Sequence, residues 1–325
     1  MYAMNRRTAM LGAGAALLGA AMPALATIDK TVRLIVPFAA GGPGDFTARQ
    51  IAVPLSRELG QNVIVENKPG ANGNLGAQSV ADAPADGSQI LLNTVGMEAI
   101  NPLLYPSMRY SPTKDFLALG IVALVPNVLV VHPEKLGVEA LQDLVRLGKL
   151  KPRGLSYATF GPGSSPHIYT SLLLKSAGIE AVQIPYKGSA PASTDVMAGN
   201  VDFLFDSMTT SVELIRGGKL KGLTITSAQR SPLLKDVPTI KECGYPEVDL
   251  KFWLSLQINA RTPAPIVESL RKAIYNCLRT REYAHALAVR GAEVLAIEPD
   301  RVQQCVMRDV ERWQALGKEI NIQPV

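Results

Sequence analysis

Residues 36–52 read VPFAAGGPGDFTARQIA, and this stretch decides the fold class. An apolar run ends at Phe38, a glycine-rich turn follows, and a pattern typical of an amphipathic helix starts at Phe46. Glycines let the backbone turn tightly and approach a ligand, while the free N–H groups at the start of a helix attract negative charge. The stretch therefore predicts a strand, an anion-binding turn and a helix in succession.

The same plan occurs a second time in the chain. LSYATF runs into GPGSS and then PHIYTSLLLKSAG, just as LIVPFAAGGPGD runs into FTARQIAVPLSREL. In each copy a small polar residue stands where the helix begins. Ser165 is expected to be the second N-cap, because Pro166 behind it suits the first helical position. Two such loops predict a small anion that is held from both sides.

A nucleotide is a poor match to the first loop. Gly42-x-Gly44 is followed by Thr47 where a dinucleotide-binding loop has its third glycine, and no Gly-Lys-Ser or Gly-Lys-Thr follows. Two interpretations stay open, because the loops either hold a small anion or are tight turns without a ligand. Asp45 is either a polar partner of the ligand or, in better agreement with its residue type, an N-cap.

Beyond these loops, short apolar runs alternate with longer amphipathic segments, which is typical of an α/β protein with parallel or mixed sheets. The expected strands are VRLIVPF, NVIVEN, QILLNT, NVLVVHP, LSYATF, VQIPYK, VDFLFD, LKGLTIT and WLSLQINA. The expected helices cover residues 46–59, 74–81, 138–149, 166–176, 190–197, 265–280 and 299–315.

Residues 1–26 are interpreted as a secretory signal peptide. Arg6 and Arg7 precede a short apolar run that ends in small residues, so the mature chain is expected to begin at Thr27 and to reside in the periplasm. The export route, general or twin-arginine, stays open. Without these two arginines the net charge falls from +5 to +3, and the basic residues are scattered among acids, which argues against nucleic-acid binding.

Motifs for catalysis and metal binding are missing from the sequence. The chain has no Gly-x-Ser-x-Gly, His-Glu-x-x-His or Cys-x-x-Cys, so no enzymatic activity, cofactor or metal is expected. Cys277 and Cys305 either form a disulfide or remain core thiols. His167 either faces a ligand or makes a structural hydrogen bond. Lys187 and Asp206 stand at strand ends, where both could contact a ligand. Otherwise Lys187 is a solvated strand end and Asp206 is a turn residue.

Longer stretches resemble the substrate-binding receptors of tripartite tricarboxylate transporters, the family often called Bug receptors. The matching stretches are, in order, VRLIVPFAAGGPGDFTAR, VIVENKPGANGNLGAQSVADAPADG, DFLALGIVALVPNVLVVHP, LSYATFGPGSSPH, IPYKGSAPASTDVMAGNVDFLFDS, AQRSPLLKDVPTIKECGYP and TPAPIVESLRKAI. Each is weak alone, but their order and spacing over essentially the whole mature chain make the match specific. The chain departs from the common pattern at Phe46 and Pro166.

The resemblance implies a periplasmic binding protein fold, with two lobes joined by two crossing strands and a ligand cleft between them. It places residues 27–125 and 252–325 in the first lobe and residues 126–251 in the second. It also implies that the first loop binds a carboxylate through backbone amides while the second loop contributes from the other lobe. The implied partners are a small carboxylate and integral-membrane transporter subunits, with the receptor a monomer. The expected ligand contacts are Phe38, Ala40, Gly41, Gly42, Asp45, Phe46, Thr94, Met97, Phe160, Ser164, Ser165, His167 and Asp206.

Four apolar side chains near predicted strand ends favour a flat ligand. Phe46, Phe160, Met97 and Met208 are interpreted either as polarizable walls between two anion sites or as core residues. Such walls suit a rigid ring with a carboxylate at each end, so an aromatic dicarboxylate such as terephthalate is favoured over citrate or an aliphatic diacid. Two other functions stay open, an exported α/β enzyme acting on a carboxylate and a ligand sensor for a signalling partner.

Overall fold

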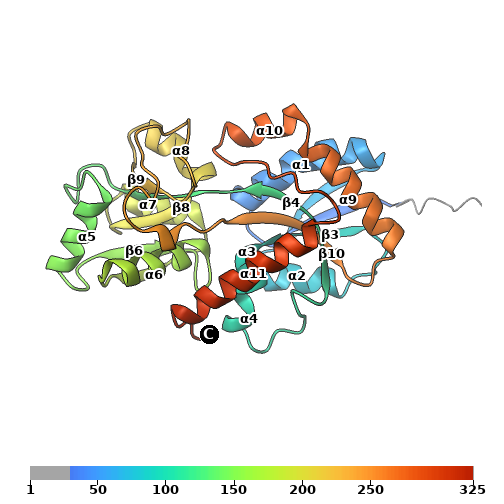
Figure 1. Ribbon diagram of the computed structural model, residues 1–325, viewed down its shortest axis with the longest axis horizontal. Coiled ribbons are helices and arrows are strands. Elements are labelled where there is room, and N and C mark those ends of the chain that lie inside the picture. The colour runs from blue at the N-terminus through green and yellow to red at the C-terminus, as the bar shows by residue number, and fades with distance from the viewer. Residues whose placement is uncertain (1–29, 325) are drawn as a thin grey trace, which may run out of the picture.

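The computed structural model describes residues 30–324, so the expected signal peptide lies outside the described residues. The chain forms two five-stranded sheets that lie side by side, each flanked by helices (Figure 1). The first sheet, in the order β2-β1-β3-β10-β4, contains β1 (Val32–Val36), β2 (Val63–Asn67), β3 (Gln89–Thr94), β4 (Phe116–Leu124) and β10 (Trp253–Asn259). The second, in the order β7-β6-β8-β5-β9, contains β5 (Asn127–Val131), β6 (Ser156–Thr159), β7 (Val182–Pro185), β8 (Phe203–Ser207) and β9 (Lys221–Ile225).

The helices fall into three groups along the chain. Those before β4 are α1 (Pro43–Leu59), η1 (Ala71–Gly73), α2 (Asn74–Ala81), α3 (Val95–Ala99) and α4 (Asn101–Leu104). Those between β5 and β10 are α5 (Leu141–Leu150), α6 (Ser165–Ala177), α7 (Ser189–Met197), α8 (Met208–Arg216) and η2 (Pro246–Val248). Those after β10 are α9 (Ala264–Leu278), α10 (Arg281–Ala288) and α11 (Val302–Glu319).

Each sheet is mixed, and its parallel part carries one of the glycine loops. β1 pairs in parallel with β2 and β3, and β6 pairs in parallel with β7 and β8. β10 and β5 run antiparallel to their neighbours. Because parallel strands end at the same edge of a sheet, the loops after β1 and β6 open at the carboxyl edges of the two sheets, where α/β proteins bind ligands. The expected α/β class is confirmed.

Strand β4 is absent from the set of strands expected from the sequence. Its residues, FLALGIVAL, are apolar without alternation because both faces are buried. Ala118 and Ile121 pack in one core cluster with α11, whereas Leu119 and Val122 pack in another with α9. A run without a period of two does not identify a strand by periodicity. Helices α3 and α4 are also absent from the expected set, because they are too short to show a helical period.

The chain crosses between the sheets twice, as expected. It leaves the first sheet after β4, continues through Val125 and Pro126 into β5, and returns to the first sheet at β10. The Val125 N–H donates to the Phe252 carbonyl oxygen at 2.9 Å, so the two crossing segments lie side by side. Helix α11 runs across the same region in Figure 1, and Glu319 at its end forms an ion pair of 2.8 Å with Lys175 of α6.

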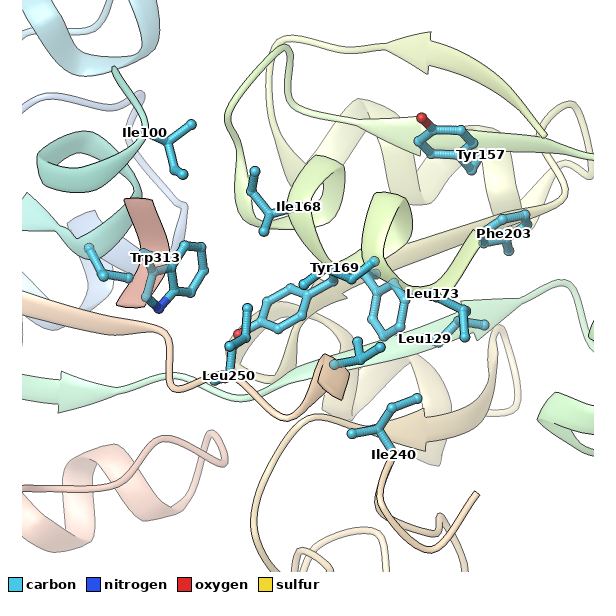
Figure 2. Packing of buried hydrophobic residues seen from close by; sticks show 14 of the residues in the cluster. Ile100, Leu129, Tyr157, Ile168, Tyr169, Leu173, Phe203, Ile240, Leu250 and Trp313 are labelled. Carbon is cyan, nitrogen blue, oxygen red and sulfur yellow. The ribbon is translucent and has the colours of Figure 1, made fainter. Parts of the chain in front are cut away.

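One apolar core fills the region where the chain crosses (Figure 2). Tyr169 of α6 lies within it, with its ring centroid 6.2 Å from that of Trp313 in α11. The Tyr169 hydroxyl donates to the Leu250 carbonyl oxygen at 2.7 Å, which ties α6 to the returning segment. Ile100, next to α3, belongs to the same core. Because this core joins both sheets, we expect any relative movement of the two halves to pivot here.

The three cysteines are free. Cys243 and Cys277 are buried and Cys305 is half-buried, so the disulfide between Cys277 and Cys305 that the sequence left open is not formed in the structure. Burial raises the pKa of the Cys277 thiol to about 12, which makes it a core thiol without reactivity at neutral pH. Within residues 30–324, none of the helices combines the length and the apolar character needed to cross a bilayer.

Candidate functional site

The first loop joins β1 to α1 and is accessible to solvent. Its residues 38–42 are exposed or half-buried, and Gly41 has a φ of 84°, a left-handed conformation that favours glycine. Helix α1 begins at Pro43 with Gly42 as its N-cap, and the Phe46 N–H makes an early helical hydrogen bond of 3.0 Å to the Gly42 carbonyl oxygen. The backbone N–H groups that precede this bond have no partner one turn earlier, so they can bind an anion.

Asp45 shapes the first loop from inside the helix. The favoured N-cap role is wrong, because α1 starts two residues earlier and Asp45 stands in its first turn. The Asp45 carboxylate is buried, accepts the Gly41 N–H at 3.0 Å and forms an ion pair of 3.0 Å with Arg49. Burial alone would raise the pKa of Asp45, but hydrogen bonds from Arg49, Gly41 and Asn67 hold it below its ordinary value. Since the Gly41 N–H is occupied, Gly42 and the first turn of α1 remain for a ligand.

The second loop joins β6 to α6. Its N-cap is Ser164 and not the expected Ser165, and Pro166 occupies the second helical position. The Ser164 hydroxyl donates to the Gly161 carbonyl oxygen at 2.7 Å and accepts the Phe160 N–H at 3.2 Å. These bonds close the loop on itself and hold Ser164 outside the helix. Two adjacent serines are equivalent as local signals, so only the folded loop decides between them.

Ser165 and His167 lie in the first turn of α6. The Ser165 hydroxyl donates to Asn127 Oδ1 at 3.3 Å, at the start of β5. His167 Nδ1 accepts the Gly163 N–H at 3.2 Å, so the structural hydrogen bond considered from the sequence is present. Burial lowers the pKa of His167, so the ring is neutral at pH 7 and its proton resides on Nε2. The Nε2–H group can still donate to a ligand.

The second loop touches the half of the molecule that carries the first loop. A Cβ atom added to Gly163, whose φ is 75°, would lie 2.4 Å from Leu104 Cδ1 and 3.2 Å from Asn72 Nδ2. A Cβ atom added to Gly96 would lie 3.4 Å from the Gly163 carbonyl oxygen. The second loop therefore packs closely against helices that flank the first sheet.

A third helix start lies beside the second loop. Helix α8 begins at Met208 directly after β8 and is capped by the Ser207 side chain. The Met208 N–H donates to the Pro126 carbonyl oxygen at 2.8 Å, and Ser207 pairs in register with Asn127, the residue that Ser165 contacts. The N-termini of α6 and α8 are therefore neighbours. Sequence reasoning missed α8, although Ser207 at the end of the predicted strand is a good N-cap signal.

Asp206 lies beneath α8, not at the surface of the site. Its side chain is 0% exposed, and the carboxylate connects β8 to α7 and α8. Its hydrogen-bond donors, at 2.7–3.0 Å, are the Ser207 N–H and the hydroxyls of Ser189, Ser193, Thr210 and Ser211. A carboxylate that is fully buried and bonded to the protein in this way positions its neighbours, and it leaves no exposed surface for the contact with a ligand expected from the sequence.

The remaining candidates divide by burial. Thr94 caps α3 by accepting the Met97 N–H at 3.0 Å, and both residues are buried. Met208 is also fully buried. Met97 and Met208 are therefore core residues in this arrangement, which was one of the two interpretations open from the sequence. Phe46 and Phe160 are half-buried, so they keep some surface for a ligand.

The loops offer hydrogen-bond donors. Their polar groups are backbone N–H groups, the Nε2–H of His167 and the hydroxyls of Ser164 and Ser165, whose protons are donated to Gly161 and Asn127 in this structure. Within the described part of the chain, no three His, Cys, Asp or Glu side chains are grouped so as to hold a metal ion. Donors arranged around helix N-termini favour the binding of an anion.

A buried acid lies behind the loops, on α3. Glu98 is 1% exposed, and its Oε2 accepts hydrogen bonds from Gln257 Nε2 at 2.6 Å and from Asn93 Nδ2 at 3.5 Å. Burial raises the pKa of Glu98 from 4.5 to about 8, against a smaller opposing effect of the Gln257 hydrogen bond. Glu98 is therefore protonated at neutral pH, and it joins β3 to β10 without an added charge.

Glu98 should make the stability of the protein depend on pH. Because its pKa is about 8 in the folded chain and 4.5 ordinarily, the folded state binds more protons than the unfolded state between these values. The contribution of Glu98 to the free energy of unfolding is fully present below pH 4.5, and it is lost as the pH rises towards 8. We expect the melting temperature to fall across this window, and to fall less in Glu98→Gln. If the melting temperatures of the wild type and Glu98→Gln fell equally with rising pH, this assignment would be contradicted.

Comparisons with known proteins identify relatives over nearly the whole chain. The tripartite tricarboxylate transporter family receptor, TctC, matches residues 47–322. The periplasmic binding protein BugD is 34% identical, with a TM-score of 0.84 over 91% of this chain and 99% of that chain. R. palustris Rpa4515 with adipate is 35% identical, with a TM-score of 0.86 over 91% and 99% of the two chains. MatC from Rhodopseudomonas palustris with bound malate is 30% identical, with a TM-score of 0.80 over 89% and 99%.

The family match begins in α1, just after the first glycine loop, and extends beyond α11, so it includes the second glycine loop and both crossing segments. The expected periplasmic binding protein fold is confirmed by the likeness to BugD. The resemblance stated from the sequence is confirmed at the level of the family. This chain belongs to the receptors of the tripartite tricarboxylate transporter family.

Proposed function

We propose that the protein captures a small organic dicarboxylate between its two glycine loops and delivers it to integral-membrane subunits of a tripartite transporter. The observation that carries this proposal is the position of the second loop. Gly163 packs against Leu104 of α4 and Asn72 of η1, so the second loop lies at the junction between the two halves, and the first loop opens at the carboxyl edge of the first sheet. One carboxylate would bind the backbone at Gly42. The other would bind the Nε2–H of His167 and the hydroxyls of Ser164 and Ser165, which would turn from Gly161 and Asn127 towards the ligand.

The proposal includes a division into two lobes that close on the ligand. Residues 27–125 and 252–325 form the first lobe and residues 126–251 the second, in agreement with the strands that each sheet contains. The crossing segments at Val125 and Phe252 and the core around Tyr169 form the hinge. A ligand that contacts both loops binds only the closed form well, so it shifts the population towards closure. The receptor acts as a monomer in this scheme.

The chemical class of the ligand rests on two supports. The loops offer hydrogen-bond donors from two sides, which suits a carboxylate at each end of a small molecule. The related structures with adipate and with malate, at 35% and 30% identity, contain aliphatic dicarboxylates. The finer hypothesis, an aromatic dicarboxylate such as terephthalate, rests on Phe46 and Phe160, because Met97 and Met208 are buried in the core.

Replacing Gly42 with valine should test the first loop without disturbing the fold. Gly42 has a φ of −84°, which any residue adopts, and a Cβ atom there would meet only the Ala39 carbonyl oxygen at 3.8 Å. The added side chain would instead keep a carboxylate away from the backbone, and we expect affinity to fall about tenfold or more, or ~1.4 kcal/mol. Lys187→Ala, at an exposed position after β7, should change affinity less. Titration calorimetry with the reverse ranking would overturn the assignment of the first loop.

Phe46→Ala tests the finer hypothesis. If the Phe46 ring lies against an aromatic ligand, its removal should weaken terephthalate binding about fivefold to tenfold, the equivalent of ~1 kcal/mol for one aromatic contact, and weaken adipate binding less. Unchanged terephthalate affinity in Phe46→Ala, or tighter binding of citrate than of terephthalate by the wild type, would refute the aromatic assignment and leave the receptor assignment intact. The complex can also be incubated and its ligand recovered. Unchanged ligand indicates a receptor, whereas converted ligand indicates an enzyme.

A further inference from the structure

The segment after α10, Arg290 and Gly291, contacts both halves of the molecule. The Arg290 guanidinium carbon lies 5.9 Å from the centroid of the Phe46 ring, which belongs to the first turns of α1. Arg290 Nη1 donates to the Thr209 carbonyl oxygen in α8 at 3.4 Å. A Cβ atom on Gly291, whose φ is 73°, would lie 2.4 Å from Met208 Cγ, so the backbone approaches the start of α8 closely. Arg290 therefore stands between the starts of two helices from opposite halves.

The charge of Arg290 has no counter-ion in this arrangement. Among residues 30–324, Arg290 takes part in no ion pair, and its side chain is exposed. Asp45, next to Phe46 in sequence, is already paired with Arg49. A guanidinium has five N–H donors in a planar fork that matches a carboxylate, and the Thr209 carbonyl occupies only part of this capacity. The remaining donors and the whole positive charge are available.

On the basis of the proposed function, we propose that Arg290 binds a carboxylate of the ligand directly and makes the receptor selective for dianions over monoanions. The Phe46 ring and the Thr209 carbonyl hold the guanidinium at the junction, and closure brings the ligand to it. Backbone N–H groups neutralise only part of the charge of one carboxylate. A full positive charge attracts the second carboxylate of a dicarboxylate, and a monocarboxylate lacks this interaction. Neither loop supplies such a charge, since Arg49 is paired with Asp45.

The experiment compares adipate with hexanoate, which has the same carbon chain and one carboxylate fewer. Wild type, Arg290→Gln and Arg290→Lys are titrated with both compounds by calorimetry at two ionic strengths. Arg281→Gln, which removes an exposed arginine from the other end of α10, is the matched control. Thermal melts verify that all variants are folded, which is expected because Arg290 is exposed.

We expect Arg290→Gln to lower adipate affinity about tenfold, to leave hexanoate affinity nearly unchanged and to reduce the dependence of adipate binding on salt, with partial rescue in Arg290→Lys. Unchanged adipate affinity in Arg290→Gln would overturn the inference. Equal losses for adipate and hexanoate would also overturn it, since a merely structural contact between the halves affects both compounds alike. If wild-type protein binds none of adipate, malate and terephthalate, the proposed function itself fails, and this result is distinct from the other two.

Discussion

Asp206→Ala is expected to lower the free energy of unfolding by about 3–5 kcal/mol, because it removes the acceptor of five hydrogen bonds, three of them buried. Ser193 and Ser211 are themselves buried, so their hydroxyls would lose a charged partner with little access to water. The starts of α7 and α8 both depend on this carboxylate. Denaturant unfolding followed by circular dichroism measures the effect.

Two further variants make this prediction specific. Asp206→Asn keeps the shape of the side chain and one good acceptor oxygen, so it should cost less, about 1–2 kcal/mol. Asp300→Ala removes an exposed carboxylate and should change stability by less than about 0.5 kcal/mol. If Asp206→Ala were as stable as Asp300→Ala, the role of Asp206 as an internal acceptor for α7 and α8 would be refuted.

Gly163→Ala is expected to weaken ligand binding about tenfold or more, because the added Cβ atom would prevent the close approach of the two halves. This atom would lie 2.4 Å from Leu104 Cδ1 and 3.2 Å from Ile100 Cγ2, on the opposite side of the junction. Small-angle scattering should show that ligand compacts the wild type and compacts Gly163→Ala much less.

Gly178→Ala provides the control for backbone strain. Gly178 ends the same helix, α6, with a φ of 63°, but a Cβ atom there meets nothing within 4 Å. Gly178→Ala should therefore cost about 1 kcal/mol of backbone strain, as Gly163→Ala does, but it adds no contact across the junction between the two halves. Equal binding defects in the two variants would mean that strain, not closure, is responsible. Absence of compaction of the wild type at saturating ligand would argue against closure altogether.

The sequence determined the fold class and most of the elements, since local periodicity and turn residues encode them. Strand β3 and helix α2 have the bounds expected, 89–94 and 74–81, because turn residues delimit both. The two glycine loops were also evident from the sequence, since a left-handed residue such as Gly41 and a proline near a helix start are local signals. The resemblance to the receptor family came from the order of such segments.

Only the tertiary structure decided what the polar residues at these loops do. Asp45 and Asp206 have the residue type of ligand contacts, but Arg49 and a group of hydroxyls use their carboxylates internally. Met97 is core because the chain packs around it, and Arg290 reaches the Phe46 ring from a segment far from either loop in sequence. Burial and hydrogen-bond partners depend on contacts between segments distant in sequence, so a local pattern fixes where a helix starts but not which of its donors and charges remain free for a ligand.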